Sequence, residues 1–254
     1  MLQNRVIPIL LYRRKGLYKT TQFKKPKYVG DPLNAIKIFN DKEVDELMFL
    51  DIEASKQNKE PEYKLIEDIA SECFMPLGYG GGIKTLDQVK RIFSLGIEKI
   101  SINHNSFKDL ALIEKAAKHF GSQSIVASID IKKSLFGKYE IFDHTKGKII
   151  KKNLFNMIQE LQNAGAGELL ITSVDREGTM QGYDLKLLSM INEKSKVPVI
   201  ANGGAGNLNH FKEVKEKSKV SAMAAGSFFV FQGKHKAVLI SYPKYEELKK
   251  ILNQ

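Results

Sequence analysis

Two glycine-rich segments lie 122 residues apart and constrain the fold more than any other feature of the sequence. They are Met75–Ile83 and Val197–Gly206, and each is a short apolar run that opens into glycines ahead of a helical pattern. Three pairs of residues share this spacing: Pro76 and Pro198, Gly81 and Gly203, and Gly82 and Gly204. A repeat of this size predicts two similar halves, because stacked or closed repeats bury the apolar faces of both copies.

The repeat extends beyond the glycines. Glu46 and Glu168 also lie 122 residues apart, and each opens a strand-like run. The two halves begin with the apolar runs Arg5–Leu11 and Ile125–Asp130, whose alignment places Leu11 opposite Asp130. We therefore predict one domain over residues 1–254, with halves at about 1–122 and 123–254.

Strand and helix patterns alternate eight times along the 254 residues, which predicts an α/β fold, a (β/α)8 TIM barrel. Asp31-Pro32 begins a helix with a capping residue and a proline, and Thr85 and Gln88 have the spacing of a capping box. Lys138–Lys151 predicts a hairpin that turns at Lys146-Gly147. The basic segment Tyr12–Gly30 is predicted to be a long loop, either a lid or binding element or a solvated loop.

In such a barrel, ligands bind at the carboxyl ends of the strands, where both glycine clusters would lie. Glycines before a helix allow backbone N–H groups to approach an anion closely, so they predict phosphate sites in opposite halves. A simple tight turn is the alternative. The residues of the predicted phosphate sites are Gly81, Gly82, Asn103, Gly203, Gly204, Gly226 and Ser227.

Asp130 would lie between the two phosphate sites, where a carboxylate can act as general acid or base. Its alternative is a strand-end carboxylate bound to nearby backbone. Asp51 and Asp175 are weaker candidates, and Asp175 also fits the start of a turn.

Four charged residues, Arg5, Glu46, Lys99 and Glu168, begin strands and would meet at the opposite face. Buried charges must be paired to be tolerated. Spacing alone favours a structural salt-bridge ring over the alternative, a polar gate for a small molecule.

The composition limits the partners. The net charge is +11, but the lysines are scattered and do not alternate with aromatic residues, so we expect no nucleic-acid partner. No apolar run approaches the roughly twenty residues that span a bilayer. With a single cysteine, Cys73, we expect a cytoplasmic protein with no membrane association, no metal and no cofactor.

The chain closely resembles the cyclase subunit of imidazole glycerol phosphate synthase over nearly its whole length. The motifs that carry this resemblance are Asp31-Pro32, Asp45–Asp51, Gly80–Ile83, Lys99–Asn103, Phe120–Gln123, Gly165–Glu168, Gly178-Thr179, Gly182–Asp184 and Gly203–Gly206. The resemblance implies a heterodimer with a glutaminase docked at the strand-start face, with ammonia entering through the four-charge gate. Glu98 matches an acidic docking position of the family, and Lys19 matches a residue of its first loop.

One departure concerns the chemistry. The family has catalytic aspartates at the ends of the first and fifth strands, but here the first position is Leu11, which cannot transfer protons. Asn202 and Gly226 stand where the family usually has serines, and His104 where it usually has threonine. The combination resembles paralogues found with surface-polysaccharide genes, and it favours amidation of a nucleotide-linked sugar.

Three alternatives remain open at this point. The chain could be a genuine cyclase of histidine biosynthesis acting on a phosphorylated substrate, or a non-catalytic activator of its glutaminase. It could also be an isomerase of the same barrel family, although Leu11 counts against that reading.

Overall fold

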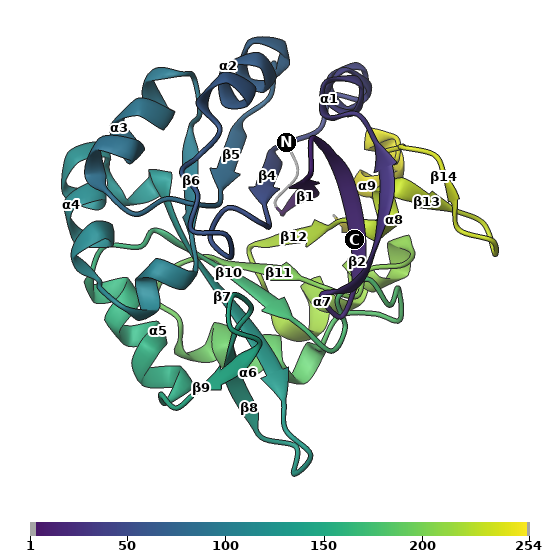
Figure 1. The fold of residues 1–254 in the computed structure, drawn as a ribbon. Coiled ribbons are helices and arrows are strands. Elements are labelled where there is room, and N and C mark those ends of the chain that lie inside the picture. The colour runs from purple at the N-terminus through teal and green to yellow at the C-terminus, as the bar shows by residue number, and fades with distance from the viewer. Residues whose placement is uncertain (1–3, 253–254) are drawn as a thin grey trace.

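Eight parallel strands form a closed barrel in the computed structural model, which describes residues 4–252 (Figure 1). Neighbouring strands pair in chain order, and the pairing of β12 with β1 closes the ring. The barrel strands are β1 (Arg5–Arg13), β4 (Leu47–Asp51), β5 (Leu77–Gly80), β6 (Lys99–Ile102), β7 (Ile125–Lys133), β10 (Glu168–Ser173), β11 (Val199–Asn202) and β12 (Ala222–Ala225). The predicted (β/α)8 barrel is confirmed.

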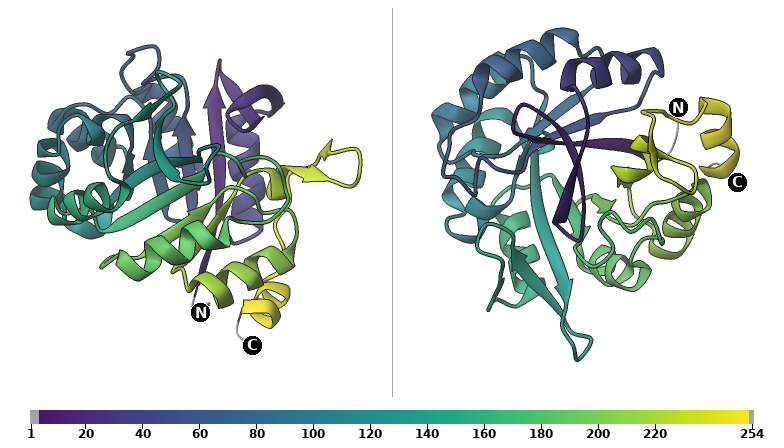
Figure 2. Two further views of the ribbon diagram at one scale, coloured as in Figure 1. Left: turned by 90° about the horizontal axis from the view of Figure 1, so that it is seen from below. Right: turned by 45° about the vertical axis from the view of Figure 1, so that its right-hand side comes forward.

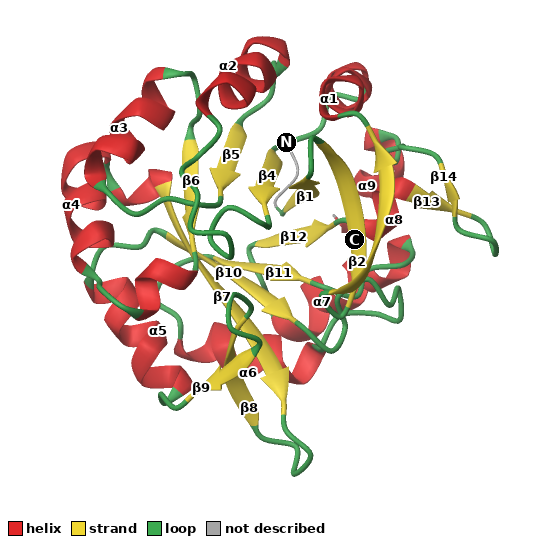
Figure 3. Cartoon of the chain, viewed as in Figure 1, coloured by secondary structure: helices red, strands yellow, loops and turns green. Residues whose placement is uncertain are grey.

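Helices surround the barrel, as Figure 3 shows in red. They are α1 (Pro32–Asp41), α2 (Tyr63–Glu72), α3 (Leu86–Ser94), α4 (Ala111–Phe120), α5 (Leu154–Asn163), α6 (Leu185–Lys194), α7 (Leu208–Ser218), α8 (Ser227–Val230) and α9 (Tyr245–Leu252), with short 3-10 turns η1 (His104–Phe107) and η2 (Ser122–Ser124). The Asp31 side chain caps α1, and Thr85 and Gln88 form the predicted capping box of α3. None of the helices described is long and apolar enough to cross a membrane.

Side chains alternate between two apolar layers along the strands. In β1, Ile7 and Ile9 pack inside the barrel, whereas Val6 and Leu10 pack in the layer between strands and helices. This follows from the period of two in a β-strand. The same alternation places Arg5 at one end of the barrel interior and Leu11 at the other.

The predicted loop over Tyr12–Gly30 is wrong. The chain there forms a hairpin of β2 (Gly16–Thr21) and β3 (Lys24–Gly30), which continues from β1 and lies across the barrel opening (Figure 2). Five of the seven β3 residues are exposed, and Pro26 interrupts the strand pattern. An exposed edge strand of this kind lacks the apolar alternation that signals a strand in the sequence.

Two further hairpins project from the barrel. β8 (Tyr139–Asp143) pairs with the end of β7 and with β9 (Lys148–Ile150), so the structure has the hairpin expected over Lys138–Lys151. A small hairpin of β13 (Phe231–Gln232) and β14 (Ala237–Val238) extends away from the barrel (Figure 2).

Candidate active site

A cavity of about 260 Å³ lies at the carboxyl ends of the barrel strands. It is lined by both glycine clusters and by Asp130, together with Lys19 from the β2–β3 hairpin. The predicted phosphate-site residues Asn103, Gly226 and Ser227 also line it. The structure therefore gathers these sequence-predicted residues around one space.

The two glycine clusters have matched backbone geometry. Gly81 and Gly203 have φ angles of 123° and 93°, in the region that favours glycine. A Cβ at Gly81 would lie 2.4 Å from the Asp51 carbonyl oxygen, and one at Gly203 would lie 2.8 Å from the Ser173 carbonyl oxygen. Asp51 and Ser173 are themselves 122 residues apart, so the repeat includes this close approach of two backbone segments.

Asp130 is buried, with 4% of its surface exposed, near the end of β7. Its Oδ2 accepts hydrogen bonds from Asn103 Nδ2 at 3.0 Å and from His144 Nδ1 at 3.0 Å. Both partners are side chains, one from the residue that follows β6 and one from the β8–β9 turn, whereas the alternative expected nearby backbone. The buried Oδ1 of Asn103 has no partner among the described residues.

Sequence reasoning missed His144. It lies in the turn between β8 and β9 and lines the cavity. Burial opposes its protonation, but the hydrogen bond to Asp130 and the charges of Asp130 and Asp143 raise the pKa of His144 above its usual 6.5. The adjacent pair Asp143-His144 within a predicted hairpin was the available signal.

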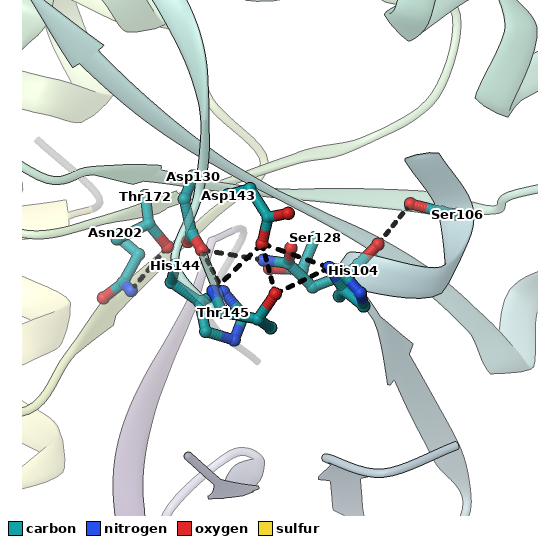
Figure 4. Close-up of polar contacts among 10 residues, drawn as sticks. His104, Ser106, Ser128, Asp130, Asp143, His144, Thr145, Thr172 and Asn202 are labelled. Carbon is teal, nitrogen blue, oxygen red and sulfur yellow. Dashed lines mark hydrogen bonds and ion pairs between the residues drawn. The ribbon is translucent and has the colours of Figure 1, made fainter. Parts of the chain in front are cut away.

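A second histidine holds the turn that carries His144 (Figure 4). His104 Nδ1 lies 3.1 Å from Asp143 Oδ1 and 3.1 Å from Thr145 Oγ1, and Thr145 Oγ1 donates to Asp143 Oδ1 at 2.6 Å. Burial lowers the pKa of His104 despite the neighbouring carboxylate. The pKa of His104 is therefore lowered while the pKa of His144 is raised.

Apolar side chains from the first two barrel strands line part of the cavity. Leu11 and Leu50 pack on the apolar interior of the barrel, next to Ile9, and all three line the cavity. Polar side chains lie on the other side, where Asn202 Nδ2 donates to Thr172 Oγ1 at 3.0 Å (Figure 4). The first-strand position Leu11 thus presents an apolar side chain to the cavity.

Lys19 is a buried cationic residue that lines the cavity. It is only 3% exposed, its Nζ donates to the Ile9 carbonyl oxygen, and burial lowers its pKa to about 8 although Glu177 counteracts the shift. A Cβ at Gly226 would lie 2.2 Å from Lys19 Nζ. Glycine at this position therefore gives the lysine ammonium its space beside the predicted phosphate site.

Glu177, another residue that sequence reasoning missed, fastens the β2–β3 hairpin over the cavity. Its carboxylate accepts from Thr20 Oγ1 and from the Phe23 backbone N–H, both at 2.9 Å. A Cβ at Gly178 would lie 2.0 Å from the Thr20 carbonyl oxygen, so glycine is required for this contact. The hairpin is thereby held in place by the β10–α6 loop.

The four strand-start charges meet at the other end of the barrel. Arg5 forms ion pairs with Glu46 and Glu168, and Lys99 Nζ lies 2.9 Å from Glu46 Oε2 and 3.1 Å from Glu168 Oε2. Each carboxylate therefore contacts both cations in a closed ring. Burial opposes the charge of Arg5, but the two glutamates raise its pKa.

The remaining candidates have different surroundings. Asp51 Oδ1 accepts from the backbone N–H groups of Glu53 and Ala54, at 2.9 and 3.0 Å, and Asp175 Oδ2 accepts from the Lys133 backbone at 2.7 Å. Both carboxylates thus have structural partners.

Glu98 is exposed on the strand-start face, next to β6. Phe74, which precedes β5, is 87% exposed and was missed by sequence reasoning.

Residues 4–252 contain no group of three or more His, Cys, Asp or Glu side chains placed to hold a metal ion. The mouth offers instead two glycine clusters, a buried lysine and paired titratable side chains. Backbone N–H groups and an ammonium suit an anionic group, and an imidazole beside a carboxylate suits proton transfer.

The arrangement defines a (β/α)8 barrel protein with a mouth whose groups suit an anion at one end and a ring of paired charges at the other. The chain belongs to the histidine biosynthesis protein family, whose sequence profile matches residues 6–236.

Three relatives illustrate this membership. "Putative imidazole glycerol phosphate synthase subunit hisF2" of Pseudomonas aeruginosa is 52% identical over 248 residues, covering 98% of this chain and 99% of that protein. "Putative imidazole glycerol phosphate synthase subunit HisF" of Leptospira borgpetersenii is 48% identical over 96% of both chains. "Imidazole glycerol phosphate synthase subunit HisF" of Campylobacter concisus is 39% identical over 88% of both. The predicted family is confirmed, while sugar amidation finds no support in these relatives.

Proposed function

We propose that this chain is the ammonia-accepting subunit of an imidazole glycerol phosphate synthase complex and receives ammonia from a glutaminase partner. The names of its relatives favour this histidine-pathway reaction, which was an alternative in the sequence analysis, over sugar amidation.

One observation carries the proposal: the ring of paired charges and the anion-suited cavity lie at opposite ends of one apolar barrel interior. Ile7 and Met48 pack in the interior layer beyond the ring, and Ile9 lies between that layer and the cavity. Ammonia is small and neutral, so it can cross an apolar interior that excludes ions. In this proposal the ring is the gate, and Glu98 and exposed Phe74 contribute to the docking face for the glutaminase.

At the mouth, the proposed substrate has a phosphate at each end. The glycine cluster at Gly203-Gly204, with Gly226 and Ser227, would hold one phosphate, and Gly81-Gly82 with Asn103 would hold the other. Lys19 would be charged when an anion binds beside it, since an opposite charge raises a lysine pKa.

Complementation tests the acceptor. A histidine auxotroph that lacks its own cyclase should grow when it expresses this chain with its glutaminase. Absence of growth, with the complex correctly assembled and consuming glutamine, would contradict the histidine reaction.

Leu11 supports a second candidate, amidation of a nucleotide-linked sugar, because the apolar wall at Leu11 and Leu50 lacks the first-strand carboxylate. Failure to complement together with ammonia-dependent amidation of such a sugar would establish this candidate. A third possibility, a pure activator, would be favoured if Asp130→Asn stimulated the glutaminase fully with no loss of product.

Crystals soaked in phosphate or sulfate test the anion sites directly. We expect density near Gly203, Gly204 and Gly226, and a second peak near Gly82 and Asn103. Density at neither position would remove the basis for a doubly phosphorylated substrate.

A further inference from the structure

We infer that His144 carries protons between the incoming ammonia and the acceptor, and that Asp130 is the positioning residue that orients its ring. The inference rests on the proposed function. It changes the part of Asp130, which the sequence analysis expected to move protons itself.

The surroundings of Asp130 hold its side chain in place. Its Oδ2 accepts from both Asn103 and His144 at 3.0 Å, and the side chain is buried. A buried carboxylate oxygen that is held by two hydrogen bonds is placed to orient the ring that donates to it. An imidazole has its ordinary pKa near neutrality and is better matched to proton transfer there.

The hydrogen bond to Asp130 also determines which ring nitrogen of His144 is available. Nδ1 donates to the carboxylate, so the neutral ring has its lone pair on Nε2. Of the two ring nitrogens of His144, only Nδ1 has a hydrogen-bond partner among residues 4–252. His144 also lines the cavity. Nε2 is therefore the nitrogen that a ligand in the cavity meets.

The ring is held on several sides. Asp143 precedes His144 and is bound by His104 and Thr145, which fixes the turn. The Phe23 ring, at the tip of the β2–β3 hairpin, contacts His144 edge-on at 6.4 Å between centroids. Groups held in this way lose little freedom when a reaction begins, which is the arrangement expected of an acid–base residue.

The opposite wall shows why His144 is needed. At the position corresponding to Asp130 in the first half, Leu11 provides no proton carrier. Lys19 and Asp51 also line the cavity, but Lys19 donates to the Ile9 carbonyl oxygen and Asp51 accepts from two backbone N–H groups. His144 and Asp130 together restore a pair of titratable groups, with both members on the same side of the mouth.

With a carbonyl acceptor, each proton that leaves the nitrogen is delivered to the oxygen. Ammonia forms an N–C bond to the carbonyl carbon, the carbonyl oxygen takes up the electron pair, and the nitrogen becomes cationic. His144 Nε2 removes a proton from this nitrogen and returns it to the oxygen, giving a carbinolamine. A second transfer along the same path breaks the C–O bond, releases the oxygen as water and leaves an imine. No oxidant or reductant is required.

Kinetics test the assignment. With ammonium salt as nitrogen source, His144→Gln should lower kcat about 100-fold or more with little change in KM, since general acid–base catalysis contributes about 10²–10⁴-fold. His144→Ala should be equally slow, and added imidazole should restore part of its activity. His235→Gln, which changes an exposed histidine on the β13–β14 hairpin, is the matched control and should behave as wild type. Full activity of His144→Gln would overturn the inference.

The pH dependence of the rate distinguishes a chemical role of His144 from a structural role. The groups that face His144 are Asp130, Asp143, His104 and Lys56. Rates are divided by the concentration of neutral ammonia, so that the titration of ammonium does not contribute. The wild-type rate should then rise with pH through the pKa of His144, and His144→Gln should lose this rise. If the rate of the variant rose with pH as in the wild type, His144 would not be the proton carrier.

A titration that needs no substrate distinguishes this inference from the proposed function. Imidazole ¹⁵N resonances should give a His144 pKa above 6.5 in the wild type and a lower value in Asp130→Asn. If the wild type turned over no acceptor, the proposed function would fall, while equal His144 pKa values in the two proteins would independently refute the pairing.

Discussion

The two ends of the barrel use charged side chains in different ways. At the strand-start end, the carboxylates of Glu46 and Glu168 each contact both Arg5 and Lys99, so the charges pair among themselves. At the mouth, Lys19 and His144 each keep hydrogen-bonding capacity toward a cavity. Mutual pairing gives each charge of the ring two partners of opposite sign, whereas the spare capacity at the mouth leaves groups that can contact a ligand.

The largest expected effect is at the mouth. Asp130→Asn should lower kcat with ammonium salt by about 100-fold or more, because the amide no longer fixes the His144 tautomer. The measurement is steady-state turnover, and Asp87→Asn, at a side chain that is 91% exposed, is the control. If kcat of Asp130→Asn fell less than tenfold, substitution at the mouth would affect turnover no more than substitution at the gate.

A glycine substitution tests the backbone of the mouth. Gly204 has φ 114°, and a Cβ there would lie 2.1 Å from the Gly182 carbonyl oxygen, whereas Gly233 has φ 69° and nothing within 4 Å. Both alanine variants incur backbone strain of about 1–3 kcal/mol, but only Gly204→Ala adds a backbone overlap. We expect its free energy of unfolding to fall by about 2 kcal/mol more, measured by denaturant titration. Equal losses of unfolding free energy in Gly204→Ala and Gly233→Ala would contradict the close approach of Gly204 to the Gly182 carbonyl oxygen.

The buried lysine predicts a pH dependence of stability. Its pKa is about 8 in the folded protein against 10.5 for the ordinary side chain. Between these values the unfolded chain binds a proton that the folded chain has released, so the free energy of unfolding should rise with pH, by at most about 3 kcal/mol.

Lys19→Met should remove that rise. The comparison is denaturant unfolding of wild type and variant from pH 7.5 to 10.5, and Lys24→Met, at an exposed position of β3, is the control. A rise that survives in Lys19→Met would show that another group causes it.

The smallest effect is expected at the gate. Lys99→Leu leaves Glu46 and Glu168 with Arg5 as their one remaining ring cation, which should distort the entry while leaving the mouth intact. Glutamine-dependent product formation should fall roughly tenfold, or about 1.4 kcal/mol, while activity with ammonium salt is largely kept. Lys115→Leu, on an exposed position of α4, is the control. Equal loss with both nitrogen sources would make Lys99 purely structural.

Local patterns in the sequence determined the barrel, the helix caps and the position of the glycine clusters. The period of two along each strand also placed Arg5, Glu46, Lys99 and Glu168 at one end, since strand starts share one face of a barrel. Such features could be predicted because each depends on residues close together in the chain. The division into two half-barrels stays a prediction.

The tertiary structure alone decided which side chains meet at the mouth. His144 lies 14 residues from Asp130 and reaches it only because β8 folds back on β7, and Glu177 contacts Thr20 across 157 residues. The mostly exposed strand β3 lacked an apolar pattern, so the segment that forms the β2–β3 hairpin was predicted to be a loop. A long-range contact with Glu177 holds this hairpin in place. Hydrogen bonds between distant side chains leave no periodic signal in a sequence, so the paired glycines could be predicted while the hydrogen bond of His144 to Asp130 could not.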